Sequence, residues 1–118
     1  MSTYKIVCLK EKTNQMVDVY PRLISKLYSY QNDMYMTKQM ELLFEPIHQG
    51  KQKLLDTISQ REDYSYFHGI HKIDNPVTQN TIDIKMNEYD IEVEEMGENH
   101  IIFDIIKGFS KNFYMISL

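Results

Sequence analysis

Two runs of alternating residues meet at a short turn in the stretch Thr81-Ile82-Asp83-Ile84-Lys85-Met86-Asn87-Glu88-Tyr89-Asp90-Ile91-Glu92-Val93-Glu94. In each run every second residue is apolar or aromatic, and the residues between are polar or charged. Because successive side chains of a strand point to opposite faces of a sheet, each run has one face suited to a core. We therefore predict strands over 81–86 and 89–95, joined as an antiparallel hairpin that is buried on one side.

Three further segments have the composition of strands. Residues 3–10 carry apolar groups at both parities, which predicts a strand that is covered on both faces. Residues 64–73 are rich in aromatic and β-branched residues, and we predict one strand there with a bulge at Gly69. Residues 112–118 are predicted to close the chain as a final strand.

Apolar residues at helical spacing predict three or four short helices. One follows Pro21, a second lies in Met36–Ile47, and a third covers 51–58. In the second, Thr37 is the expected N-cap, and Pro46 ends the helix because its ring collides with the preceding turn. The last helix follows the hairpin, and its buried residues are expected to be Ile102, Ile105, Ile106 and Phe109.

These segments add up to an α+β fold. About five strands form a mostly antiparallel sheet, and three or four short helices cover it as the second layer of a two-layer sandwich. The lack of β-α-β alternation argues against a parallel, doubly wound fold. The chain has 118 residues, a usual size for one domain, so we expect a single α+β domain over residues 1–118.

Composition and charge argue against several classes of function. The formal net charge is −4 and arginine occurs only at Arg22 and Arg61, whereas DNA binding normally needs a row of cations. No apolar run approaches the ~20 residues that span a bilayer, and the first residues lack the apolar stretch of a signal peptide. The single cysteine suits a reducing compartment. We expect a cytoplasmic monomer that contacts neither nucleic acid nor membrane.

Candidate catalytic and metal-ligating residues are few. His68 and His71 are three positions apart, which on a strand sends their rings to opposite faces and forms no metal site. Cys8 lies in an apolar strand, where a thiol is normally packing. The glutamates of 92–95 could do acid–base work, but we interpret them as the solvated face of the hairpin. The sequence therefore predicts no enzyme, no metal and no cofactor.

Tyrosine and methionine gather in residues 15–45. Tyrosine gives a large contact area with few rotatable bonds, and methionine adds adaptable apolar surface. In the helix expected over 36–47, Gln39 and Leu42 lie on or beside the open face. Because nothing resembles an active site, we expect this segment to be presented to a protein partner, and the negative net charge suits a partner with positive charge.

Four blocks follow one another over most of the chain, namely Tyr4–Glu11, Met36–Gln39 with Pro46-Ile47, Asp63–Ile70, and Ile91–Val93 with Ile102-Phe103. In this order they resemble a known family, the sporulation inhibitor of replication proteins (SirA) of Gram-positive bacteria. The first block looks like the family's first strand, and the second like its short helix with one residue fewer. The third looks like the first strand of its sheet, and the fourth like its last hairpin strand and last helix.

The resemblance implies a small α+β protein that binds the N-terminal domain of the replication initiator DnaA and blocks initiation by masking that domain's partner-binding surface. In the family, the segment after the first strand and the short helix make the contact. By position, Gln39 matches a contacting glutamine, and Leu42 stands where the family has an aromatic residue. Thr13 and Val17 also replace aromatic residues. With apolar area from neighbouring positions, the implied partner-binding residues are Thr13, Met16, Val17, Tyr20, Thr37, Gln39 and Leu42.

Two alternatives to a DnaA-binding regulator stay open. One is a small enzyme or ligand-binding domain with a pocket between sheet and helices. The other is a phage-encoded or accessory protein on the same scaffold that targets another host protein. A perturbed polar cluster in a closed cavity would favour the first alternative, and a flat apolar patch at residues 15–45 would favour the regulator.

Overall fold

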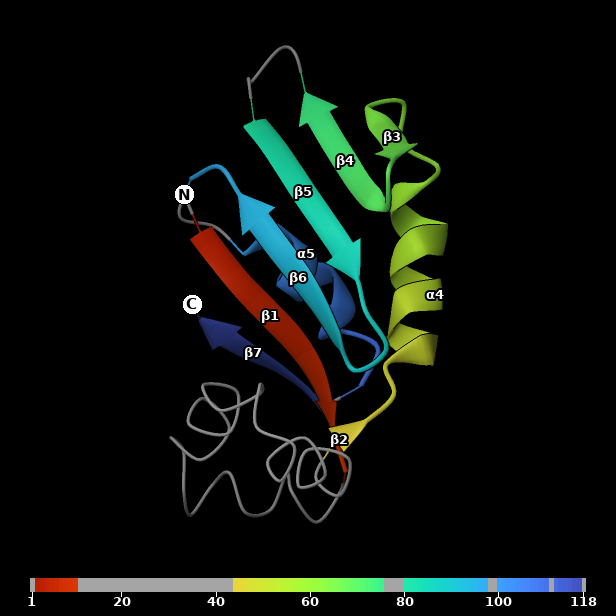
Figure 1. Cartoon of the computed structure of the whole chain (residues 1–118), viewed down its shortest axis with the longest axis vertical. Coiled ribbons are helices and arrows are strands. Elements are labelled where there is room, and N and C mark those ends of the chain that lie inside the picture. Colours follow the sequence, from red (N-terminus) through yellow and green to blue (C-terminus); the bar gives the residue numbers. More distant parts are fainter. Residues whose placement is uncertain (1, 11–43, 76–79, 98–99, 111, 118) are drawn as a thin grey trace.

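The computed structural model describes residues 2–10, 44–75, 80–97, 100–110 and 112–117. They form an α+β fold in which an antiparallel sheet carries two helices, one of them short. Figure 1 shows α5 behind β6, and residues of both helices share one core with the sheet. The strands are β1 (Ser2–Leu9), β2 (Phe44–Glu45), β3 (Tyr64–Phe67), β4 (Ile70–Asn75), β5 (Asn80–Met86), β6 (Asp90–Glu95) and β7 (Phe113–Ser117), and the helices are α4 (His48–Ile58) and α5 (Ile101–Ile106).

Every strand pairing in the described sheet is antiparallel, in the order β2-β1-β6-β5-β4-β3, and β7 also pairs with β1. The predicted hairpin is confirmed, because β5 and β6 pair with Ile84 opposite Val93. Across its turn, the Asn87 N–H donates to the Asp90 carbonyl at 2.9 Å, and the Asn87 side-chain amide donates to the Asp90 carboxylate at 2.7 Å. These two bonds close the turn over Glu88 and Tyr89, so β6 begins at Asp90, one residue later than the sequence predicted.

The main core lies between one face of the sheet and the two helices. Leu54 and Ile58 of α4 are fully buried, as are Ile102 and Ile106 of α5. In each pair the residues are one helical turn apart, so each helix turns one apolar side to the sheet. From the sheet, the residues that pack against them are Tyr4, Ile6, Ile73, Ile82, Ile84, Ile91 and Val93.

β1 is covered on both faces, as its sequence predicted. Tyr4 and Ile6 belong to the main core, whereas Val7 and Leu9, at the other parity, belong to a second apolar cluster. We call this second group the outer cluster, because it lies on the face of the sheet opposite the main core. The outer cluster consists of Val7, Leu9, Phe44 and Ile116, with Tyr89 and Tyr114 packed against it.

The prediction of one strand over 64–73 is wrong. These residues form β3 and β4, which are joined by a two-residue turn at His68-Gly69. Both turn residues have positive φ, 51° for His68 and 81° for Gly69, as expected for a tight hairpin. Aromatic and aliphatic residues continue through the turn, so composition alone did not reveal it. This division and the short strand β2 give a seven-stranded sheet in place of the expected five strands.

The predicted helix over Met36–Ile47 is wrong at its C-terminal end. Phe44 and Glu45 form β2, which pairs with Leu9 and Cys8 of β1. The rest of that segment lies outside the described residues, as does the helix expected after Pro21. A partner from β1 therefore overrode the local helical spacing at Phe44.

The two described helices differ from their predicted bounds. α4 begins at His48 and so includes Gly50, which the sequence placed before the helix. A Cβ at Gly50 would come within 2.9 Å of the Phe113 ring, so the absent side chain lets β7 and α4 approach closely. α5 ends at Ile106, and Phe109, expected in its buried stripe, lies beyond it and is 37 % exposed.

Candidate functional site

The sequence-predicted contact residues lie outside the described residues, so the structure gives the position of their flanks. β1 and β2 pair with Leu9 opposite Phe44. These two residues flank the contact segment in the sequence and lie side by side in the fold (Figure 1). The predicted contact residues to which this applies are Thr13, Met16, Val17, Tyr20, Thr37, Gln39 and Leu42.

Both flanks are held by apolar burial. Leu9 and Phe44 are 1 % and 0 % exposed, and both belong to the outer cluster. The Leu9 N–H also donates to the Asn112 carbonyl at 2.9 Å, which ties the end of β1 to the start of β7. Burying a large apolar side chain contributes about 1.5–3 kcal/mol, so each flank has a firm attachment to the sheet.

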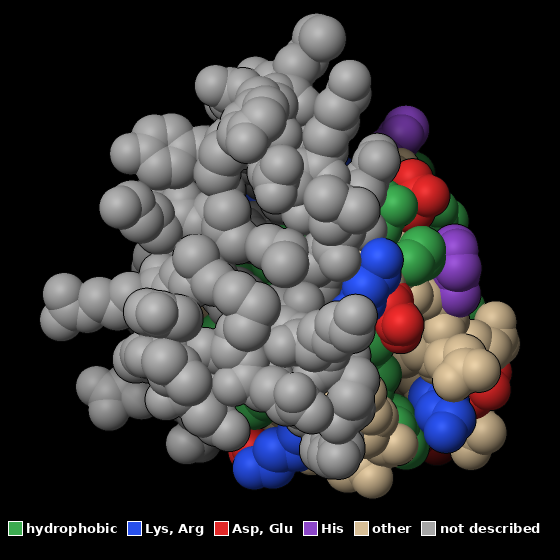
Figure 2. All heavy atoms as spheres, turned by 90° about the horizontal axis from the view of Figure 1, so that it is seen from below, with side chains coloured by type: hydrophobic (Ala, Val, Ile, Leu, Met, Phe, Trp, Pro, Cys, Tyr) green, Lys and Arg blue, Asp and Glu red, His purple; other side chains and the backbone are tan. Residues whose placement is uncertain are grey.

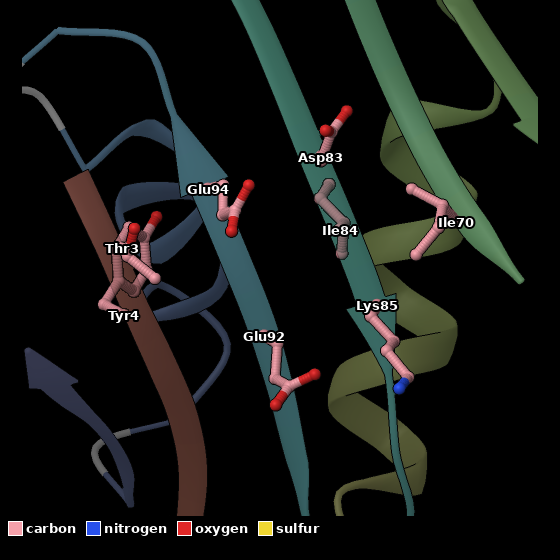
Figure 3. Close-up of a pocket in the computed structure, with 8 residues that line it drawn as sticks. All are labelled: Thr3, Tyr4, Ile70, Asp83, Ile84, Lys85, Glu92 and Glu94. Carbon is pink, nitrogen blue, oxygen red and sulfur yellow. The ribbon is translucent and has the colours of Figure 1, made fainter. Parts of the chain in front are cut away.

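A groove crosses the outer face of the sheet over β1, β6, β5 and β4 (Figure 3). Thr3, Glu94 and Asp83 are cross-strand partners, which puts their side chains on the same face. The groove holds about 300 Å³ and is lined by Thr3, Tyr4, Ile70, Asp83, Ile84, Lys85, Glu92 and Glu94.

Lysines on the same face lie close to the acids of this groove. Lys5 Nζ is 3.4 Å from Glu92 and 3.9 Å from Asp90, and Lys72 Nζ is 3.7 Å from Oδ1 of Asp83. That oxygen of Asp83 is buried and has no hydrogen-bond donor among the described residues. The described lining of the groove combines carboxylates with a lysine and contains no histidine or cysteine. This set of carboxylates, a lysine and a threonine hydroxyl can make polar contacts and ion pairs with a bound group.

A second hollow, of about 720 Å³, lies where β1, β2 and the start of α4 meet. Cys8, Lys10, Glu45 and His48 are among its lining residues. Burial, and then the nearby Glu45, raise the pKa of the Cys8 thiol, so its reactive thiolate is disfavoured. On the face seen from below in Figure 2, the described surface mixes basic, acidic and histidine side chains.

Glu95 contradicts the interpretation of residues 92–95 as a solvated face. It is 1 % exposed, and its carboxylate accepts hydrogen bonds from the Tyr4 hydroxyl at 3.0 Å, from Ile101 N–H at 3.1 Å and from Ile102 N–H at 3.0 Å. It therefore satisfies free N–H groups at the start of α5, where His100 provides no side-chain cap. The signal was present in the sequence, because Glu95 shares the parity of the buried residues Ile91 and Val93.

Tyr4 completes this buried network. Its hydroxyl oxygen accepts from Phe103 N–H at 3.2 Å while the hydroxyl donates to Glu95. Burial, together with the neighbouring Glu95 carboxylate, raises the pKa of Tyr4 far above its usual value, although the bond from Phe103 opposes that shift. The hydroxyl thus keeps its proton, and the network joins β1, β6 and α5 as a structural device.

His71 and Tyr64 form a second polar pair, between β4 and β3. The Tyr64 hydroxyl lies 2.7 Å from Nδ1 of His71. Burial lowers the pKa of His71, which favours the neutral ring, and the hydroxyl and Nδ1 share one hydrogen bond. Within the described residues, no group of three histidine, cysteine, aspartate or glutamate side chains could hold a metal ion.

No protein-family model matches this chain, and no curated protein matches its sequence. None of the described helices is both long and apolar enough to cross a membrane. Within the described residues, the candidate surfaces are the groove, the hollow beside β2 and the edge of the sheet at β3.

Proposed function

We propose that this protein is a non-enzymatic cytoplasmic regulator that binds the N-terminal domain of DnaA and inhibits the initiation of DNA replication. The proposal rests on the SirA-like order of its sequence blocks and on one structural observation, the pairing of Leu9 with Phe44. This pairing fixes both flanks of the contact segment at one place on the sheet. A segment attached at both ends loses less conformational freedom on binding than a free tail. In this proposal the segment supplies the early helices of a two-layer sandwich.

The proposed mechanism is steric competition. A monomer bound to the N-terminal domain of DnaA would occupy the surface that helicase-loading proteins and other partners of the initiator need. The net charge of −4 favours encounter with a positively charged surface. The ligand-binding alternative expected a pocket between sheet and helices. The groove of Figure 3 lies on the opposite face of the sheet, whereas the hollow lined by Cys8, Glu45 and His48 lies where strands and the start of α4 meet, and that hollow is the place to test this alternative.

The test is a calorimetric titration of the purified N-terminal domain of DnaA with the wild-type chain and with the double variant Gln39→Ala, Leu42→Ala. If the two residues are central contacts, the variant should bind about 1–3 kcal/mol more weakly. Folding should change by less than about 0.5 kcal/mol, because surface substitutions rarely cost more. Gln60→Ala, at an exposed position after α4, is the matched control and should bind as the wild type does.

Equal affinities of wild type and double variant would remove Gln39 and Leu42 from the interface. Failure of the wild-type chain to bind the domain at all would refute the proposed function. The alternative of an accessory protein with another host target would then be tested by capturing binding partners from a bacterial lysate.

A further inference from the structure

One edge of the described sheet is formed by β3, which pairs with β4 on one side only. β3 stands last in the strand order β2-β1-β6-β5-β4-β3, so within the described residues no strand pairs with its outer edge. Proteins usually protect such an edge with a very short strand, lysine, proline or a bulge. β3 is short, with four residues. The sequence of β3, Tyr-Ser-Tyr-Phe, contains neither lysine nor proline, and its pairing with β4 runs without a bulge.

The hydrogen-bonding groups on this edge can be assigned from the register. The residues that flank a two-residue turn exchange hydrogen bonds, so Phe67 and Ile70 form such a pair, and the pattern alternates along the strands. The Asp74 N–H donates to the Asp63 carbonyl at 3.0 Å, as this alternation requires. Residues 63, 65 and 67 therefore bond to β4, and the N–H and C=O groups of Tyr66 point away from the sheet.

Exposed aromatic rings flank these free groups on both faces. Tyr66 is 59 % exposed on the face of His71, whose ring centroid lies 4.6 Å away. Phe67 is 74 % exposed on the opposite face and contacts the His68 ring at 3.9 Å between centroids. Cross-strand neighbours stabilise a sheet when aromatic rings pack on β-branched side chains. The side chains of an added strand could therefore pack on Tyr66 at one face of the sheet and on Phe67 at the other.

The charge beside the start of β3 indicates what kind of strand fits. A hollow of about 660 Å³ there is lined by Arg61, Glu62, Asp63, Asp74 and Asn75. Arg61 is engaged by Asp63 through two bonds of 2.8 and 2.9 Å, and it lowers the pKa of that carboxyl. Because Arg61 and Asp63 neutralise each other, the carboxylates of Glu62 and Asp74 give the hollow a net negative charge. In an antiparallel pairing, the C-terminal end of an added strand would lie beside this negative charge.

We propose that the β3 edge is a second interaction surface, which binds an extended segment of another protein as an added antiparallel strand with basic residues at its C-terminal end. The N–H and C=O of Tyr66 bond to the backbone of that segment, and Tyr66 and Phe67 pack on its side chains. A second copy of this chain is the poorer occupant, because two copies would bring together chains that each carry a net charge of −4. The surface is independent of the proposed DnaA contact, which uses residues between 13 and 42.

The experiment uses the full chain and a synthetic peptide of about eight residues that alternates valine with threonine and ends in two lysines. Binding is followed by NMR through the amide shift and the hydrogen-exchange protection of Tyr66, at low salt. A second peptide carries methyl groups on the backbone nitrogens that face β3, and a third has glutamate in place of lysine. We expect the lysine peptide to protect the Tyr66 amide and each comparison peptide to bind about tenfold more weakly.

Two variants at one position separate the backbone edge from the ring. Tyr66→Pro removes the outward N–H, which an edge strand can lose without breaking its own ladder. Tyr66→Ser removes the ring and keeps the N–H. We expect the proline variant to lose at least about threefold more affinity than the serine variant. If the proline variant does not fold, the methylated peptide on the wild-type chain carries the same comparison.

Several results would overturn the proposal. These are no protection of Tyr66 by the lysine peptide, equal binding of the methylated peptide, and equal binding of the glutamate peptide. Protection of Tyr66 that rises with protein concentration in the absence of peptide would make a second copy the occupant instead. None of these results depends on DnaA, so this proposal and the proposed function fail or survive separately.

Discussion

Replacement of Glu95 by alanine should destabilise this protein more than its place among exposed hairpin glutamates would indicate. The carboxylate is 1 % exposed and joins three elements, since Tyr4 of β1 and the first N–H groups of α5 all donate to it. The alanine variant would leave the Tyr4 hydroxyl and the N–H groups of Ile101 and Ile102 without this acceptor. It would also leave a void at the junction of β6 and α5.

The size of the effect can be worked from these contacts. The bonds from Tyr4 and Ile102 are buried, and the bond from Ile101 is partly buried. Each buried donor that loses its partner costs about 1–3 kcal/mol, so two of them cost about 2–6 kcal/mol. The variant no longer carries the desolvation cost of a buried carboxylate, which offsets part of this loss. We expect a net decrease of about 3 kcal/mol in the free energy of unfolding.

The assay is urea unfolding followed by far-ultraviolet circular dichroism, because the chain contains no tryptophan. Glu94→Ala is the matched control, since Glu94 is the exposed neighbour on the same strand and should cost less than about 0.5 kcal/mol. Tyr4→Phe, which keeps the ring and leaves Phe103 N–H without its acceptor, should cost about 1–2 kcal/mol. If Glu95→Ala lies within about 1 kcal/mol of Glu94→Ala, the buried network does not hold α5 to the sheet.

Two further predictions follow from perturbed pKa values. Burial lowers the pKa of His71, so the unfolded chain binds a proton at this ring at a higher pH than the folded chain does. The free energy of unfolding should therefore fall as the pH drops below about 6.5. Urea unfolding at pH 7.5 and 5.5 should show a larger fall in that free energy for the wild type than for His71→Gln, and equal falls would contradict a lowered pKa of His71. Burial and the nearby Glu45 raise the pKa of Cys8, so little of its reactive thiolate is present at pH 7.5. Iodoacetamide at that pH should alkylate the folded chain at least about tenfold more slowly than the urea-unfolded chain. Equal rates would show an accessible thiol with an ordinary pKa.

Local patterns were sufficient where the burial of a strand leaves a periodic record. The strict alternation of 81–94 predicted β5 and β6, with the turn between them one residue too early. The apolar residues at both parities of 3–10 predicted that β1 is covered on both faces. The α+β class and the antiparallel sheet followed from these segments. Such patterns persist because each strand must turn apolar side chains to a core whatever its partners are.

Two errors came from reading one segment at a time. Phe44 fits the apolar side of a helix by spacing, but in the fold it pairs with Leu9 and is buried in the outer cluster. Residues 64–73 read as one strand because the aromatic and aliphatic run continues through His68-Gly69, where the backbone takes positive φ. In both places the deciding contact is with a strand that local spacing does not reveal.

For the candidate surfaces, the division between sequence and structure is equally clear. The sequence by itself determined the composition of the proposed contact segment, its Gln39 and Leu42, and the net charge of the chain. Only the tertiary structure decided that Leu9 and Phe44 lie together, that Glu95 is buried beside α5, and that Tyr66 stands on the edge strand of the described sheet. The physical reason is that each of these facts depends on which distant segment satisfies a backbone or side-chain group. Such pairing is set by the whole chain folding together, while periodicity records only which side of an element is apolar.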